Sequence, residues 1–334
     1  MTGPSPDEGP ALPVRGPARA DPAGPPEPPE PPLAVTEYTD PLCPWAWGAE
    51  PEFRLLRTAL AGRARWRRVY GILFDTDDDP APDPAAETAW YEGFVRGVGA
   101  HTGAPHAVRL SRVAATSWPA SLVAVAARAQ GGQVADRVLR RLRESMFVAG
   151  EPADTLELAL RAAGGVPGLD AVRLAADAGS AEVLAAVEAD HRETREPLPE
   201  ALTAEDPGPH PGTAKETSDG RLRYALPTLL FSGPAGRRLV PGRRPLDAYL
   251  AAIEAVAPGL PGVRPAVQRP DTEALLAYHR SLSGPEWALL APGGAPPGRA
   301  VRIETGNGPL WLHPAEAAAR PWAAAAPVQH ADQR

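Results

Sequence analysis

The predicted fold rests on one stretch, Val35-Thr-Glu-Tyr-Thr-Asp40-Pro-Leu-Cys43-Pro-Trp-Ala46-Trp-Gly48, which contains the only cysteine of the 334-residue chain. The residues before Cys43 are apolar and β-leaning and predict a strand over 33–39. Those after it show helical spacing and predict a helix over 44–61. A cysteine at this junction faces free backbone N–H groups and the positive end of the helix dipole, which favour the thiolate. We therefore expect Cys43 to be a reactive thiol, although a lone cysteine is more often a small buried hydrophobe.

The residues around Cys43 resemble a known active site. Asp40-Pro-Leu-Cys43-Pro44-Trp45-Ala46-Trp47-Gly-Ala-Glu-Pro51 is similar to the active-site stretch of DsbA-like thioredoxin-fold proteins, above all those of the cytoplasmic FrnE-like, or dithiol-disulfide isomerase-like, branch. That branch usually carries Cys-Pro-x-Cys followed by an aromatic residue. Ala46 stands here in place of the second cysteine, so the resemblance implies a monothiol variant.

A second match lies much further along the chain, where Pro227 interrupts a strand-like run from Arg221 to Phe231. Proline is unfavourable within a central strand, but a cis-proline at the start of a strand is a known exception. Leu226-Pro227-Thr228 resembles the cis-Pro-Thr stretch that lies against the reactive cysteine of thioredoxin folds. The resemblance implies Cys43 as the catalytic residue. The implied substrate-binding residues are Pro44, Trp45, Ala46, Trp47, Leu226, Pro227 and Thr228.

The order of predicted elements indicates an α/β, thioredoxin-like fold with an inserted all-helical domain. A strand over 63–74 follows the first helix, which suggests a parallel βαβ unit. The predicted parts of this fold are the first half of the core at 33–85, the helical insertion at 86–196 and the second half of the core at 197–258. Within the insertion, Ser117 is predicted to cap one helix and Asp154 to open another, while 197–220 is expected to be a surface loop.

The two ends of the chain have a different character. Residues 1–32 are rich in proline, and they cannot bury enough apolar surface to offset their ordering entropy, so they are predicted to be a disordered tail. Residues 266–325 predict a small C-terminal α+β module with a helix over 271–282 and short strands at 288–290, 301–303 and 310–312. Relatives in the FrnE-like branch often carry a winged-helix-like tail, and the module is compatible with one.

Composition narrows the class of function. The formal net charge of −7 provides no positive field for nucleic acid, and the module shows no basic recognition helix. Lys215 is the only lysine, and we interpret the arginine excess as the compositional bias of a GC-rich bacterial genome. One cysteine excludes an internal disulfide framework. Neither an export signal nor a membrane-spanning segment is visible, so we expect a cytoplasmic protein without membrane contact.

No metal site is predicted. The acidic run at 75–79 lacks the ligand alternation and the central glycine of a calcium loop, so a solvated loop is expected. The seven histidines are dispersed, and no two pairs show zinc-ligand spacing.

The expected chemistry is the first half of a dithiol reaction. A single thiolate attacks a partner disulfide and remains in a mixed disulfide until another thiol releases it. The substrates would be protein or small-thiol disulfides, with glutathione or mycothiol as a co-substrate and no bound cofactor.

Two alternative functions stay open. One is a kappa-type glutathione transferase or hydroxychromene-carboxylate isomerase-like enzyme, and the other is an adaptor that binds a peptide beside Pro227 without chemistry, as Clp-protease adaptors of this fold do. The sequence does not indicate an oligomeric state.

Overall fold

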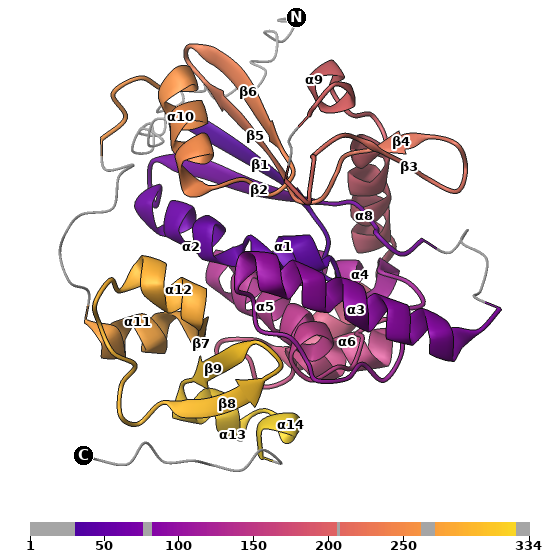
Figure 1. Ribbon diagram of the computed structural model, residues 1–334, viewed down its shortest axis with the longest axis vertical. Coiled ribbons are helices and arrows are strands. Elements are labelled where there is room, and N and C mark those ends of the chain that lie inside the picture. Colours follow the sequence, from indigo (N-terminus) through magenta and orange to yellow (C-terminus); the bar gives the residue numbers. More distant parts are fainter. Residues whose placement is uncertain (1–30, 76–81, 206–207, 262–270, 325–334) are drawn as a thin grey trace, which may run out of the picture. The chain divides into compact units, whose positions relative to one another are not determined.

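A four-stranded mixed sheet forms the centre of the fold. The computed structural model describes residues 31–75, 82–205, 208–261 and 271–324, and Figure 1 shows their arrangement. The central strand β1 is parallel to β2 and antiparallel to β5, which pairs with β6 in turn. The sheet order is β2(Ala64–Tyr70), β1(Leu33–Thr39), β5(Thr228–Gly233), β6(Gly236–Pro241). This is the predicted α/β, thioredoxin-like class. Residues 1–30 of the predicted Pro-rich tail and residues 76–79 of the acidic run lie outside the described residues.

The single helix predicted over 44–61 is two helices, α1(Pro44–Gly48) and α2(Glu50–Ala59). The helix breaks at Ala49, because Pro51 has no N–H to donate to the carbonyl of Trp47. Helices α2 and α10(Leu246–Val256) pack on the sheet and form one core with it. Its largest buried members are Leu33, Phe53, Leu56, Leu60, Phe231 and Tyr249.

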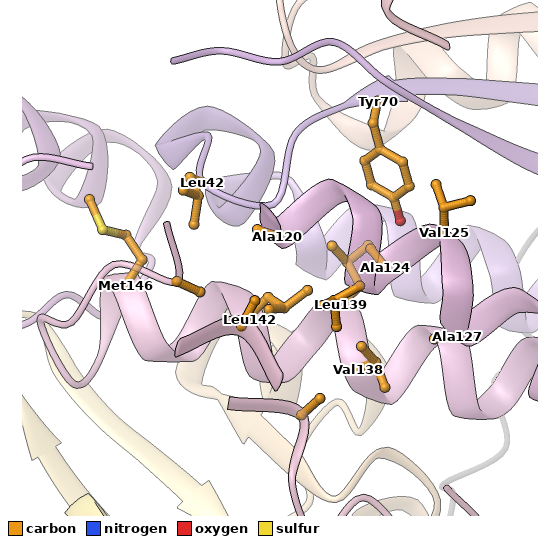
Figure 2. Packing of buried hydrophobic residues seen from close by; sticks show 14 of the residues in the cluster. Leu42, Tyr70, Ala120, Ala124, Val125, Ala127, Val138, Leu139, Leu142 and Met146 are labelled. Carbon is orange, nitrogen blue, oxygen red and sulfur yellow. The ribbon is translucent and has the colours of Figure 1, made fainter. Parts of the chain in front are cut away.

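The inserted helices form a second core. They are α3(Pro84–Thr102), α4(Trp118–Ala126), the short 3-10 helix η1(Ala127–Gln130), α5(Gly132–Phe147), α6(Leu156–Ala163), α7(Ala171–Ala178) and α8(Ala181–Thr194). Figure 2 shows side chains of α5, among them Val138, Leu139 and Leu142, close to the small residues of α4. Leu42, the neighbour of Cys43, belongs to the same core and so anchors the cysteine turn to the inserted helices.

Two predicted helix caps differ from the structure. Ser117 is at the N-cap position of α4, but its hydroxyl donates to Asp40 Oδ1 (3.2 Å) instead of accepting from the helix. Thr155 caps α6 by accepting from the N–H of Leu158, while Asp154 forms a bidentate pair with Arg112. In both cases the side chain predicted to cap the helix bonds to a partner distant in sequence instead.

The predicted surface loop at 197–220 contains some regular structure. Helix α9(Pro199–Leu202) lies near its start, and strand β3(Lys215–Glu216) pairs with β4(Leu222–Arg223) to form a small hairpin. Ala201 of α9 is fully buried. The segment is therefore packed onto the core in part, although its composition indicated only turns.

The C-terminal module contains helices and a separate three-stranded antiparallel sheet. Its elements are α11(Thr272–His279), β7(Ser281–Ser283), α12(Gly284–Leu290), β8(Val301–Thr305), β9(Gly308–Leu312), α13(Pro314–Ala318) and α14(Pro321–Ala324), with sheet order β7-β9-β8. The strands predicted at 301–303 and 310–312 are confirmed, but the strand predicted at 288–290 is wrong. Those residues lie in α12, because Ser283 and Glu286 form a capping box that starts a helix there.

A largely buried network of ion pairs joins this module to the rest of the protein. We call it the arginine–carboxylate network, and its members lie on β1, β2, α2, α5 and the module. The members are Arg54, Arg57, Arg68, Arg140, Arg141, Arg143, Arg280 and Arg320 with Glu37, Glu50, Asp136, Glu144, Glu286 and Glu316. In Figure 1, α11 and α12 lie beside α2, where Leu55 packs against Leu282 and Trp287.

Arg140 occupies the middle of the network. Its two terminal nitrogens donate to the two carboxylate oxygens of Glu286, each at 2.8 Å. Its Nε donates to Glu144 at 2.6 Å, and its guanidinium carbon lies 4.3 Å from the ring centre of Trp47 in α1. One side chain of α5 thus contacts both the C-terminal module and the helix that follows Cys43.

Glu286→Gln is expected to lower the free energy of unfolding by about 3 kcal/mol, because removing one partner of a buried pair leaves a buried charge uncompensated. Urea denaturation of the full chain measures the effect. The matched control is Glu157→Gln, whose exposed pair with Arg161 is open to solvent and should hardly matter. Equal unfolding midpoints for the two variants would contradict the role given to Glu286.

Candidate active site

The structure brings Cys43 and Pro227 to one place. Cys43 is the N-cap residue of α1, and a three-residue turn, 40–42, connects it to the end of β1. Its Sγ donates a hydrogen bond to the backbone carbonyl of Leu226 at 3.4 Å. The Leu226–Pro227 peptide bond is cis, the isomer that the sequence favours. The two stretches that the resemblance singled out are therefore in direct contact, although 183 positions separate Cys43 from Leu226.

Thr228 continues this contact into the sheet. Its backbone pairs with Tyr38 of β1 and with Pro241 of β6. Its side chain is fully buried, donating to the carbonyl of Ala225 at 2.6 Å and accepting from the N–H of Gly242 at 3.2 Å. These bonds fix the turn that presents Leu226 to the thiol.

The two tryptophans of the cysteine stretch face different cores. Trp45 belongs to the same buried cluster as Cys43 and Ala46, and its ring packs against His101 and His210 with centroid distances of 5.7 and 4.8 Å. Trp47 belongs to the core of the inserted helices, where its Nε1 donates to the carbonyl of Pro105 at 2.7 Å. Trp45 is thus near the sulfur, while Trp47 holds α1 against the inserted helices.

The thiol is closed off from solvent. Cys43 is 3 % exposed, Ala46 is fully buried, and the hollow beside Pro44 has no room for a water molecule. Burial is the main cause that raises the pKa of the Cys43 thiol to about 11. The charge of Asp40 raises this pKa further, while the backbone N–H groups of Ala46 and Trp45 lower it. The predicted activation by the helix terminus is therefore wrong for this state, because desolvation outweighs what a five-residue helix supplies.

Asp40 is the polar centre of the cysteine turn, and the sequence analysis assigned it no role. The side chain is fully buried and accepts from the N–H groups of Leu42 (2.6 Å) and Leu73 (2.7 Å) and from the hydroxyl of Ser117. Burial raises the pKa of Asp40, and those three hydrogen bonds oppose the rise. One feature of the sequence could have pointed to Asp40: it comes directly after the strand and three residues before Cys43.

Two more polar side chains near the thiol were missed. Burial raises the pKa of Tyr91 well above its usual value, with the charges of Cys43 and Asp40 adding to the effect. The Tyr91 hydroxyl makes no hydrogen bond within the described part of the chain. His210 packs on Trp45, and burial lowers its pKa to about 4. Nothing in the local sequence distinguishes either residue, since both approach the site from distant segments.

Neither a metal nor a membrane segment is indicated by the described ranges. They hold no group of three or more histidine, cysteine or acidic side chains arranged to bind a metal ion. Within the same ranges, every helix is too short or too polar to span a bilayer.

Comparison with known proteins agrees with this geometry. The family model described as Thioredoxin matches residues 37–197. No curated protein matches the chain. Among solved structures, a candidate protein disulfide isomerase from Nitrosomonas europaea is similar at 17 % identity and a TM-score of 0.51, with 66 % of this chain and 96 % of that chain covered. The cytosolic disulfide reductase DsbM from Pseudomonas aeruginosa is similar at 15 % identity and a TM-score of 0.45, with 67 % and 93 % covered.

The sheet order, the inserted helices, the cysteine at the start of α1 and the cis-proline against it define a class of thioredoxin-fold protein. The chain shares a thioredoxin-like fold with these structures, and the Thioredoxin family model covers just under half of its length. Its single cysteine and Ala46 at the second position depart from the Cys-Pro-x-Cys pattern of the DsbA-like proteins that its sequence resembles. The division into domains and the winged-helix resemblance of the C-terminal module stay predictions.

Asp40→Asn is expected to lower the pKa of Cys43, because the charge of Asp40 is one of the causes that raise it. Alkylation of Cys43 across a pH series, read by intact mass, measures that pKa. Ser117→Ala is the matched control, since it removes a hydrogen bond to Asp40 and keeps the charge. A Cys43 pKa that is the same in Asp40→Asn and in the parent protein would show that the carboxylate does not act on the thiol.

Proposed function

We propose that the protein is a DsbA-family thiol-disulfide oxidoreductase that acts through Cys43 alone. The observation that carries this proposal is the hydrogen bond from Cys43 Sγ to the carbonyl of Leu226, directly before cis-Pro227. A cysteine that served only as a core residue would have no need of this polar partner, which is provided by a proline turn. The match of residues 37–197 to the Thioredoxin family model supports the same reaction class.

The proposed reaction needs no bound cofactor. Cys43 loses its proton and its sulfur attacks one sulfur of a partner disulfide. A new S–S bond forms, the old one breaks, and the second partner sulfur leaves as a thiolate. Because Ala46 cannot resolve this mixed disulfide, an external thiol attacks it and releases Cys43 as a thiolate. Glutathione or mycothiol would serve as that co-substrate, and a protein or small-thiol disulfide as the first substrate.

Reaction requires the closed site to open. Cys43 is packed in a cluster that includes Tyr224 and Ala201, both contributed by the segment before Pro227. Displacing that segment would expose the sulfur and free the carbonyl of Leu226 for an extended substrate. Exposure would also remove the desolvation that raises the thiol pKa.

The burial of Cys43 favours one second candidate, a peptide-binding protein that does no thiol chemistry. A thiol with a pKa near 11 is almost wholly protonated at pH 7, and a protonated thiol is a poor nucleophile. In this function the backbone beside Pro227 binds an extended segment and Cys43 is a buried packing residue. The two functions differ in whether the sulfur of Cys43 ever forms a mixed disulfide.

Incubation with oxidised glutathione at pH 8 tests the proposal. A single glutathione adduct on Cys43 is expected by intact mass, and added reduced thiol should remove it. Cys43→Ser should give no adduct. Ala46→Cys provides the matched variant, since a second thiol three residues later can resolve the adduct and should reduce its yield. If the parent protein stays unmodified while a free cysteine peptide reacts under the same conditions, the peptide-binding function is favoured.

A further inference from the structure

A cavity lies where α2, α5 and α11 meet, away from Cys43. Its volume is about 370 Å³, which is within the range of small-molecule sites. Its lining includes Arg54, Arg57, Arg137, Tyr278 and His279. The last two residues belong to α11, so the C-terminal module completes a wall that α2 and α5 leave open.

The surroundings of the cavity carry an excess of positive charge. The charged residues of its lining are three arginines, Arg54, Arg57 and Arg137, and two carboxylates, Glu50 and Asp136, so one positive charge is in excess. Arg137 has no carboxylate partner among the described residues, where its terminal nitrogens donate to the main-chain carbonyls of Pro167 and Tyr278. A bound anion would supply the counter-charge that Arg137 lacks there.

Two arginines of the lining have donor groups without an acceptor. Nη1 of Arg57 and Nε of Arg137 are buried, and neither makes a hydrogen bond to any described residue. The nearest carboxylate contact recorded for Arg57 Nη1 is Glu37 Oε2 at 3.5 Å. Two carboxylates, Glu50 and Asp136, also line the cavity, but each is already shared between arginines. Unmade bonds from charged donors suit an oxyanion.

The pKa of His279 is also affected by the positive charge around the cavity. Burial lowers the pKa of His279 to about 2, and the charges of Arg54, Arg57 and Arg140 lower it further, while Glu50 opposes them. The imidazole is therefore neutral at pH 7 and adds no positive charge to the lining. Tyr278, 56 % exposed, provides an aromatic surface beside the cavity for the uncharged part of a ligand.

We propose that this cavity binds the phosphoryl group of a small phosphorylated metabolite, held by Arg57 and Arg137. A phosphoryl group supplies oxygen acceptors for the unpaired donors of Arg57 and Arg137, and arginine binds phosphate through paired N–H donors. The C-terminal module then has a function of its own in this chain, which is to close a ligand site against α2 and α5. The site is independent of the chemistry proposed for Cys43.

Calorimetric titration of the full chain with inorganic phosphate, and separately with pyrophosphate, tests the proposal. Both titrations are made at an ionic strength held constant with potassium chloride. Saturable binding is expected for both probes and not for added chloride. Arg137→Gln should weaken it at least tenfold, because Arg137 supplies donors to the cavity without belonging to an ion pair. Ala61→Phe, at the edge of the cavity, keeps every charge and should weaken it similarly by filling space.

Three controls make the outcome decisive. Arg161→Gln changes an exposed arginine of α6 that does not line the cavity and should leave the affinity unchanged. Cys43→Ser should also leave it unchanged, which separates this site from the proposed redox function. Circular dichroism verifies that each variant is folded. The proposal is overturned if phosphate shows no saturable binding, if acetate binds as tightly as phosphate, or if both cavity variants bind phosphate as well as the parent.

Discussion

The rest of the structure depends on the position of Arg140. Its guanidinium is held by both oxygens of Glu286, by Glu144 and by the ring of Trp47. Because a buried guanidinium must have nearly all its donors satisfied, these partners cannot move independently. The contact therefore joins the C-terminal module, helix α5 and the helix that begins after Cys43. Truncating the module would leave Arg140 and Arg54 buried without the carboxylate of Glu286.

The cysteine turn is held by a series of such constraints. Trp47 lies against Arg140 on one side, and its indole N–H reaches the carbonyl of Pro105 on the other. The loop that contains Pro105 is fixed in turn by the module, because Asn307 in the β8–β9 hairpin donates to the carbonyls of Gly99 and Ala104. Asp40 holds the beginning of the turn from inside. The thiol is thus placed against Leu226 by parts of the chain that never touch it, and the same packing removes it from water.

The sequence could predict the contact between Cys43 and Pro227, because each stretch has its own signature and the fold family joins them. It could not predict the raised pKa of the thiol. That Cys43 lies at the start of a helix is a local property, which Pro44 indicates. The burial of its thiol depends instead on residues distant in sequence, such as Val98, Ala201 and Tyr224. The strand predicted at 288–290 was wrong because a short apolar run does not distinguish strand from helix, and the capping box at Ser283 decides between them. The arginine excess was interpreted as compositional bias, since the spacing of arginines along the chain gives no sign of the carboxylates they meet in space.

The measurement that tests this account most directly is the alkylation rate of Cys43 at pH 7 in the folded chain, compared with the same chain unfolded in urea. Since the folded thiol is buried and its pKa is raised to about 11, the folded rate should be at least about tenfold slower and should keep rising beyond pH 9. Folded and unfolded rates that are equal, or a folded rate that levels off below pH 8, would contradict a closed thiol held against Leu226.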